Sequence, residues 1–159
     1  MKNKKSYTVD EATKVLEYFC SYQERSHKEV EKKLYDLKMI PAAKEKIILH
    51  LIQHNFLNEE RFSKAFARGK FSIKKWGKLK IINELKFRDI SSYNIITALK
   101  EIDDQEYKNT LQALAEKKIK LIKETNYFKK RAKLSAFLIS KGYETSLVYE
   151  IVNQLFSEE

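Results

Sequence analysis

The chain reads FLNEERFSKAFARGKFSIKKWGKLKIINELKFRDI from Phe56 to Ile90, and this stretch decides the fold. Asn58 can cap a helix, because its side-chain oxygen can accept a hydrogen bond from an otherwise unpaired backbone N–H of the first turn. Glu59 and Glu60 then fall in that first turn, where the helix dipole favours negative charge. We therefore predict that a helix begins directly after Asn58.

The helical spacing of this stretch separates apolar from basic side chains. The apolar stripe consists of Phe62, Ala65, Phe66, Gly69 and Ile73. The basic stripe consists of Arg61, Lys64, Arg68 and Lys75. Trp76-Gly77 interrupts the pattern, and a second short helix follows with apolar residues Leu79, Ile81, Ile82 and Leu85. One face of the stretch therefore suits a core and another suits anions.

Helix-start signals recur along the rest of the chain. Ser26 and Glu29 form a capping box, and Pro41 suits the first turn of a helix, where its missing N–H is no loss. Further caps are expected at Thr8, at Ser91 or Ser92, and at Asp103, Asn126 and Thr145. With the central stretch, these signals predict nine helices.

The nine helices form three similar groups of three. After a flexible basic tail at residues 1–7, we place repeat 1 at residues 8–57, repeat 2 at 58–102 and repeat 3 at 103–157. Residues 80–99 match residues 133–152 at an offset of 53, with apolar residues at equivalent places. Each group is too small to bury its apolar face alone. We therefore predict an all-α fold of three tandem three-helix repeats, stacked into an elongated, curved array.

Positive charge is concentrated in repeat 2. The 159-residue chain has a net charge of +10, but repeat 2 has 11 basic against 5 acidic residues, whereas residues 103–159 have 10 against 9. Basic helix faces can pair with phosphates, and neighbouring aromatic residues such as Phe71 can stack on bases, although a merely solvated face is the alternative. We expect Trp76 to pack between helices. The candidate residues for binding a polyanionic partner are Arg61, Lys64, Arg68, Lys70, Lys74, Lys75, Lys78, Lys80, Arg88, Lys129, Lys130 and Arg131.

Other functional classes find little support in the residues. A helix-turn-helix reader of duplex DNA would offer only Asn94 for base recognition. His50 and His54 stand four apart, but Cys20 and His27 add no metal-site spacing, so we expect no metal or cofactor. No nucleotide-binding glycine loop or catalytic motif is present, which argues against an enzyme.

The sequence also favours a protein without a membrane span. It has no apolar run of signal-peptide or membrane-span length, and its single cysteine cannot form an intramolecular disulfide. A basic amphipathic segment from Lys117 to Lys133 could touch an anionic membrane, but packing of the repeats needs its apolar stripe. We expect a cytoplasmic monomer.

The central stretch resembles the RecX family, the bacterial regulators of the RecA recombinase. The matching residues are Leu57 to Phe62, then Phe66, Arg68, Gly77, Ile81 or Ile82, Glu84-Leu85 and Arg88 to Ile90. The likeness extends more weakly to Arg25 to Val30 with Leu34, and to Lys141-Gly142-Tyr143. The resemblance implies a fold of three tandem three-helix repeats. Two residues depart from the family pattern: Asp89 stands where Gly is frequent, and Lys78 follows Gly77 where Pro is common.

The resemblance implies a non-enzymatic protein that binds RecA filaments on single-stranded DNA. Such a protein lies along the filament groove and blocks filament extension or promotes disassembly, which lowers ATP hydrolysis, strand exchange and co-protease activity in recombination, DNA repair and the SOS response. By position, Arg61, Arg68 and Arg88 carry over as contacts. The alternative is a free-standing basic nucleic-acid-binding protein that acts by competing for DNA.

Overall fold

The computed structural model describes residues 6–157, and within this range the chain forms nine helices and no strand. The expected basic tail begins in residues 1–5, which lie outside the described part. The prediction of an all-α fold is confirmed. The helices are α1 (Val9–Tyr22), α2 (His27–Asp36), α3 (Pro41–Gln53), α4 (Glu59–Ser72), α5 (Lys78–Phe87), α6 (Ser92–Leu99), α7 (Asp104–Leu121), α8 (Tyr127–Ser140) and α9 (Thr145–Ser157).

Most helices begin at the capping residues that the sequence indicates. In each case the side-chain oxygen accepts a hydrogen bond from the backbone N–H three residues later. These caps are Thr8, Ser26, Asn58, Ser91, Asp103 and Asn126. Pro41 occupies the first turn of α3, as expected. The prediction for Thr145 is wrong, since α9 begins at Thr145 itself and the Val148 N–H donates to the carbonyl of Glu144.

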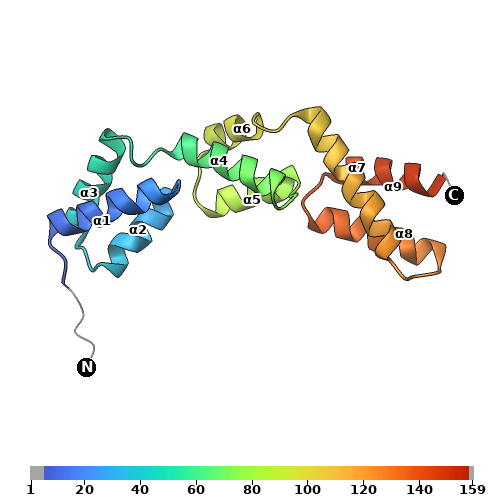
Figure 1. The fold of residues 1–159 in the computed structure, drawn as a ribbon, viewed down its shortest axis with the longest axis horizontal. Coiled ribbons are helices and arrows are strands. Elements are labelled where there is room, and N and C mark those ends of the chain that lie inside the picture. The colour runs from blue at the N-terminus through green and yellow to red at the C-terminus, as the bar shows by residue number, and fades with distance from the viewer. Residues whose placement is uncertain (1–5, 158–159) are drawn as a thin grey trace, which may run out of the picture.

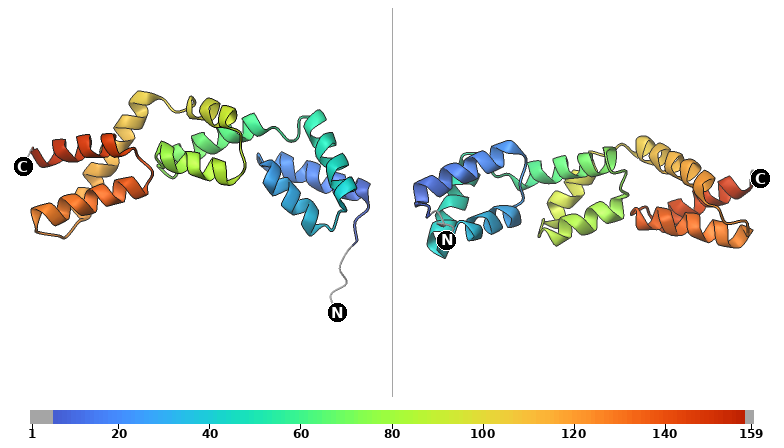
Figure 2. Two further views of the ribbon diagram at one scale, coloured as in Figure 1. Left: turned by 180° about the vertical axis from the view of Figure 1, so that it is seen from behind. Right: turned by 60° about the horizontal axis from the view of Figure 1, so that its bottom comes forward.

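The helices form three bundles of three, which follow one another in an elongated, bent row (Figure 1). Helices α1 to α3 lie at one end of the row and α7 to α9 at the other, with α4 to α6 between them. The views from behind and from below show the same succession (Figure 2). This arrangement confirms the predicted array of tandem three-helix repeats.

The buried side chains divide into two cores. Repeat 1 has its own core, built around Leu16, Leu34 and Leu51. Repeats 2 and 3 share a second core, which runs from Phe62 in α4 to Phe156 in α9. The expectation that a repeat is too small to bury its apolar face alone therefore fits repeats 2 and 3, which share a core, but is wrong for repeat 1.

Repeats 2 and 3 meet backbone to backbone, at Gly77 before α5 and Gly142 after α8. The Gly77 amide donates to the Lys141 carbonyl at 2.7 Å, and the Leu79 amide donates to the Gly142 carbonyl at 2.9 Å. A Cβ atom at position 77 would lie 2.2 Å from the Gly142 carbonyl carbon, and one at position 142 would lie 2.4 Å from Lys80 Cβ. Gly142 also has a φ of +99°, which residues with side chains rarely adopt. Both positions therefore require glycine.

Two buried tyrosines complete this joint. The Tyr107 hydroxyl accepts a hydrogen bond from the Lys78 amide at 2.9 Å and donates to the Glu144 carboxylate. The Tyr143 hydroxyl donates to the Lys75 carbonyl at 2.9 Å, and the two rings lie 5.2 Å apart between centroids. Burial raises the pKa of both hydroxyls, and for Tyr107 the hydrogen bond to Glu144 raises its pKa further.

Repeats 1 and 2 are joined by side chains instead. The offset of 53 places Asp89 where repeat 3 has Gly142, and Asp89 adopts a φ of 58° despite its side chain. Lys28 of α2 reaches across this joint: its Nζ donates to the Phe87 carbonyl at 3.0 Å and lies 3.7 Å from the Asp89 carboxylate. No close approach of backbones like that at Gly77 and Gly142 is formed here.

The core-facing side of α4 differs from the predicted stripe. The buried residues are Phe62, Ser63, Ala67 and Phe71. Ile73, which was expected in the core, is 76% exposed, because the buried face of α4 runs through Ala67 and Phe71 and leaves Ile73 on the opposite side. The core side of α4 is therefore rotated from the predicted one.

Candidate functional site

Arg61 forms an ion pair and several hydrogen bonds within the protein. Its Nε donates to the Glu24 carboxylate at 2.5 Å, and its terminal nitrogens donate to the Asn55 side chain at 3.1 Å and to the Asn55 carbonyl at 3.0 Å. A further contact, at 3.4 Å, reaches the Phe56 carbonyl. Because Glu24 lies between α1 and α2, these bonds tie repeat 1 to the first turn of α4. Arg61 thus has a structural role in addition to its predicted place on a binding surface.

Four other predicted binding residues form ion pairs. An ion pair lowers the positive field that a side chain offers to an external anion. The pairs are Lys64 with Glu60 at 3.0 Å, Arg68 with Glu101 at 3.5 Å, Lys78 with Asp104 at 3.4 Å and Arg88 with Glu84 at 2.9 Å. Arg68 remains the most accessible of them, with 53% of its side chain exposed.

A row of alternating cations and rings runs across repeat 2. Lys80 Nζ lies 4.6 Å from the centroid of the Trp76 ring, and Lys70 Nζ lies 4.9 Å from the same ring. Lys70 Nζ is also 5.4 Å from the Phe66 ring, over which the Arg88 guanidinium lies at 4.8 Å. These are cation–π distances, so the two rings fix the positions of three cations.

The turn between α4 and α5 adds two exposed lysines to this row. Repeat 3 holds the turn, because Lys141 Nζ donates to the Lys74 carbonyl at 3.1 Å and the Tyr143 hydroxyl donates to the Lys75 carbonyl. Within the described residues, Lys70, Lys74, Lys75 and Lys80 form no ion pair with a carboxylate. We call these four residues, grouped around Trp76, the lysine turn.

The predicted cluster in repeat 3 lies apart from the lysine turn. Lys129 and Lys130 are in the first turns of α8, and the Arg131 guanidinium lies 5.8 Å from the Phe156 ring. Phe128 beside them is 76% exposed. Lys129 and Lys141 are twelve residues apart at the two ends of α8, a helical rise of about 18 Å. The basic residues therefore form two separate clusters, not one continuous stripe.

The expectation that Phe71 stacks on a base is wrong, whereas the weak case for base recognition by Asn94 finds no support. Phe71 cannot stack on a base, because it is buried and packs with its ring 5.8 Å from that of Tyr107. Asn94 donates to the Glu59 carboxylate at 2.6 Å, so its side chain is occupied within the protein. Trp76 is half-buried and packs edge-on against Phe66, in line with the expected packing between helices. The sequence reasoning missed Lys141 and Tyr143 as supports of the turn, although their match to the family motif marked them.

The reactive side chains of the described residues form no candidate metal centre. Residues 6–157 contain no group of three or more His, Cys, Asp and Glu side chains placed to hold a metal ion. His50 and His54 stack on each other, and His50 Nε2 lies 3.6 Å from the Glu17 carboxylate. Cys20 is buried, which raises the pKa of its thiol to about 11. In the part of the chain that is described, no helix combines the length and the apolar character that crossing a bilayer requires.

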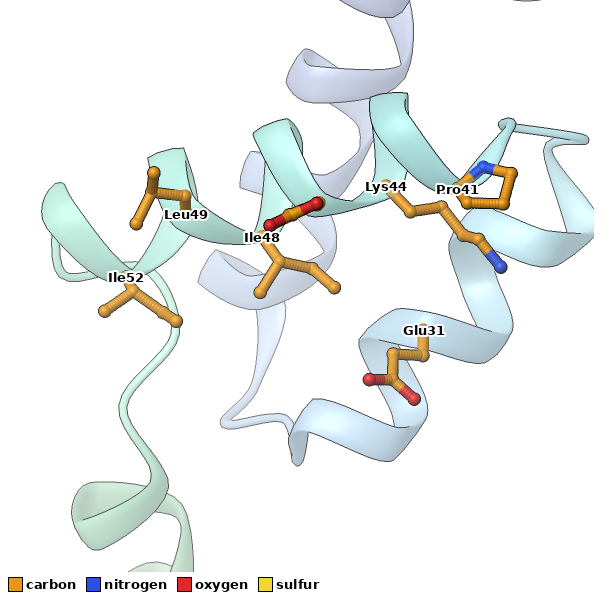
Figure 3. Close-up of a pocket in the computed structure, with 7 residues that line it drawn as sticks. Glu31, Pro41, Lys44, Ile48, Leu49 and Ile52 are labelled. Atoms are coloured by element: carbon orange, nitrogen blue, oxygen red, sulfur yellow. The ribbon is translucent and has the colours of Figure 1, made fainter.

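One surface hollow lies on repeat 1, and another lies between repeats 1 and 2, where Lys70 of the lysine turn is part of its lining. Figure 3 shows the first, a hollow of about 530 Å³ where Ile48, Leu49 and Ile52 of α3 lie with Glu31 of α2 nearby. The second, of about 380 Å³, lies between repeats 1 and 2 and is bordered by residues of both repeats. Its lining consists of Gln23, Glu24, Glu29, Phe62, Ala65, Phe66, Lys70 and Arg88. Carboxylates make the repeat 1 side of this second hollow unfavourable for phosphate.

Comparison with known proteins identifies the family. Residues 58–99 match the family profile described as RecX, second three-helix domain, and residues 104–152 match RecX, third three-helix domain. The chain belongs to the RecX family. It is 31% identical over 134 residues to the regulatory protein RecX of Chlorobium phaeobacteroides, a match that covers 84% of this chain and 86% of that protein. The resemblance seen at Phe56 to Ile90 is thereby confirmed.

Other RecX proteins are longer or more distant. The chain is 30% identical over 135 residues to RecX of Clostridium beijerinckii, a match that covers 84% of this chain but 62% of that protein. The crystal structure of RecX from Lactobacillus salivarius superposes with a TM-score of 0.81 at 24% identity, over 92% of this chain and 96% of that one. A second crystal structure, of a regulatory protein RecX, gives a TM-score of 0.83 at 20% identity, over 92% of this chain and 73% of that one. At these identities the structural likeness shows the fold.

Proposed function

We propose that this RecX-family chain regulates the RecA recombinase by binding RecA filaments on single-stranded DNA. In this proposal it acts in the cytoplasm as a non-enzymatic monomer and lowers the ATP hydrolysis, strand exchange and co-protease activity of RecA. The observation that carries the proposal is the concentration of unpaired lysines in repeat 2 of an elongated RecX fold. An elongated array can lie along a filament groove and contact several protomers at once.

The two basic clusters suit a partner that is itself extended. The lysine turn and the cluster from Lys129 to Arg131 stand at the two ends of α8. A short anion would meet only one of them, whereas a filament that encloses a nucleic acid presents acidic groups along its length. Of the three arginines that the family resemblance marks as contacts, Arg68 is the most exposed and is the preferred contact with RecA.

The test is substoichiometric inhibition. The purified protein is added, well below the RecA concentration, to preformed RecA filaments on single-stranded DNA, and ATP hydrolysis is followed over time. We expect hydrolysis to fall, because too little protein is present to compete for the DNA. An Arg68→Glu variant should inhibit less at unchanged far-UV circular dichroism. No effect of the unmodified protein at any ratio would refute the proposal.

A free-standing nucleic-acid binder is the second candidate, because the unpaired lysines suit bare DNA equally well. Competition for DNA would need protein in proportion to the DNA-binding sites, and it would disappear as salt weakens direct DNA binding. Inhibition that begins only at that ratio and is lost at 200 mM salt would favour this candidate.

A further inference from the structure

We infer that the lysine turn is a phosphate-binding element for a single strand of nucleic acid, and that Trp76 positions its cations instead of stacking on bases. The inference rests on the proposed function, because it names which residues of that surface meet the strand. Its basis is the placement of Lys70 and Lys80 over one half-buried ring, with the exposed Lys74 and Lys75 in the turn directly before it.

The lysine turn offers positive charge that other basic residues of the chain do not. Arg61, Lys64, Lys78 and Arg88 are all bound to carboxylates within the chain. The four lysines of the lysine turn form no ion pair with a carboxylate of the described residues, so their charge is available to an external anion. Arg88, at the other end of the cation–ring row, is paired with Glu84 and, together with Lys70, borders the hollow that Glu24 and Glu29 line. A polyanion is therefore drawn to the Trp76 end of the row and away from the Arg88 end.

The Trp76 ring is occupied by two lysine side chains. The Trp76 ring carries the ammonium groups of Lys70 and Lys80 within 5 Å of its centroid, and its edge packs against Phe66. A base could stack on this ring only after displacing a cation, which would lose a cation–π contact of about 1 kcal/mol and a phosphate partner. The ring therefore serves to hold two ammonium groups, and recognition is of the phosphate backbone with little preference among bases.

The turn between α4 and α5 is held in place by repeat 3 without any ligand. Lys75 has a φ of 60°, and the hydrogen bonds of its carbonyl and that of Lys74 come from Tyr143 and Lys141 in repeat 3. The neighbouring Gly77 is fixed by a backbone hydrogen bond to the same segment. A pre-organised site loses less conformational entropy on binding.

The shape of the site favours a single strand over a duplex. Duplex DNA is stiff, with a persistence length of about 50 nm, so it would touch only lysines that lie along one straight groove edge. A flexible single strand can follow the turn from Lys70 to Lys80. An acidic protein segment could offer the same charge, and the experiment below distinguishes it from a nucleic acid.

The experiment measures binding of the full chain to fluorescein-labelled 20-nucleotide oligo(dT) and oligo(dA) by anisotropy, between 50 and 200 mM salt. Each phosphate contact to a single strand contributes a slope of about −0.7 in log K against log salt, so four lysines predict a slope of about −2.8. The variant K70Q/K80Q should reduce this slope to about −1.4 and weaken binding about 25-fold at 100 mM salt, because each lost contact accounts for about fivefold. The matched control is K14Q/K46Q, which removes the same charge from two exposed lysines of repeat 1 and should leave the slope unchanged.

Trp76 supplies an independent readout, because it is the only tryptophan of the chain. Its emission should change on binding of unlabelled oligo(dT), with a midpoint equal to that from anisotropy. Oligo(dA) and oligo(dT) should bind within about twofold of each other. Equal effects of the two double variants, or a preference for one base above tenfold, would overturn the inference. So would equally tight binding of polyglutamate with the same change in emission.

Failure of this inference can be told apart from failure of the proposed function. If K70Q/K80Q binds oligonucleotides like the unmodified protein, the phosphate-binding role of the lysine turn is refuted, whatever happens with RecA. If the unmodified protein binds oligonucleotides as expected but leaves RecA hydrolysis unchanged, the proposed function fails and the inference stands.

Discussion

Replacing Gly77 by alanine tests the joint between repeats 2 and 3 directly. The new Cβ would lie 2.2 Å from the Gly142 carbonyl carbon and 2.3 Å from the Tyr143 amide nitrogen, both backbone atoms that cannot rotate away. The repeats must separate locally, which breaks the hydrogen bonds from Gly77 to Lys141 and from Leu79 to Gly142. Two such bonds are worth about 2 kcal/mol, and the strain of overpacking adds about 2 kcal/mol. We expect the free energy of unfolding to fall by about 4 kcal/mol.

Urea unfolding, followed by circular dichroism and by Trp76 fluorescence, measures this loss. With an m-value of about 2 kcal/mol per M urea, the midpoint should fall by about 2 M. Gly69→Ala is the matched control: Gly69 lies inside α4 with no atom within 4 Å of the added Cβ, so alanine should stabilise the helix by about 0.7 kcal/mol and raise the midpoint slightly. An unchanged midpoint for Gly77→Ala beside the expected rise for Gly69→Ala would refute the backbone contact between the repeats.

Three further predictions concern other buried groups. Arg61→Gln leaves the partly buried Glu24 carboxylate without its partner, so the free energy of unfolding should fall by about 2 kcal/mol. Limited proteolysis should cut the segment between repeats 1 and 2 faster in this variant. An unchanged cleavage rate would contradict the role of this ion pair. Burial holds the pKa of Tyr107 and Tyr143 above the unfolded value of about 10, so the stability that these two hydroxyls contribute is complete below pH 10 and is lost as the pH rises further. The loss is up to about 1.4 kcal/mol per pH unit for each tyrosine. Urea midpoints at pH 9, 10 and 11 measure this loss, and Tyr143→Phe should make the fall in midpoint with pH less steep. Cys20, with a pKa of about 11, should react slowly with a thiol reagent at pH 8 in the native protein and fully in denaturant; fast native reaction would show that the thiol is accessible.

Local signals in the sequence were enough to predict the fold. Caps such as Ser26 and Asn58 depend on atoms three residues away, so they can be recognised without knowledge of the tertiary structure. The internal match at an offset of 53 then predicted the repeats. The end of α4 was predicted less well, because the helix stops at Ser72 under the influence of the turn that repeat 3 holds.

The candidate site was less predictable, because its charges depend on partners distant in sequence. Arg61 and Glu24 are 37 positions apart, and Arg68 pairs with Glu101 across repeat 2. Helical spacing places these arginines on a basic stripe but says nothing about acids brought in by other helices. The pairing of Lys70 and Lys80 over one ring has the same origin, since α4 and α5 must fold back on each other to form it.

The two joints of the array differ in the residues that stand where the repeats meet. Gly142 lets the loop after α8 touch the backbone at Gly77, and the core continues from repeat 2 into repeat 3. At the equivalent position Asp89 carries a side chain, the loop instead meets the long arm of Lys28, and the two cores stay separate. Hydrogen bonds between uncharged backbone groups are little affected by salt, whereas an ion pair with an 80% exposed carboxylate is screened. Added salt should therefore weaken the contact between Lys28 and Asp89, while repeats 2 and 3, and with them the lysine turn, remain one unit.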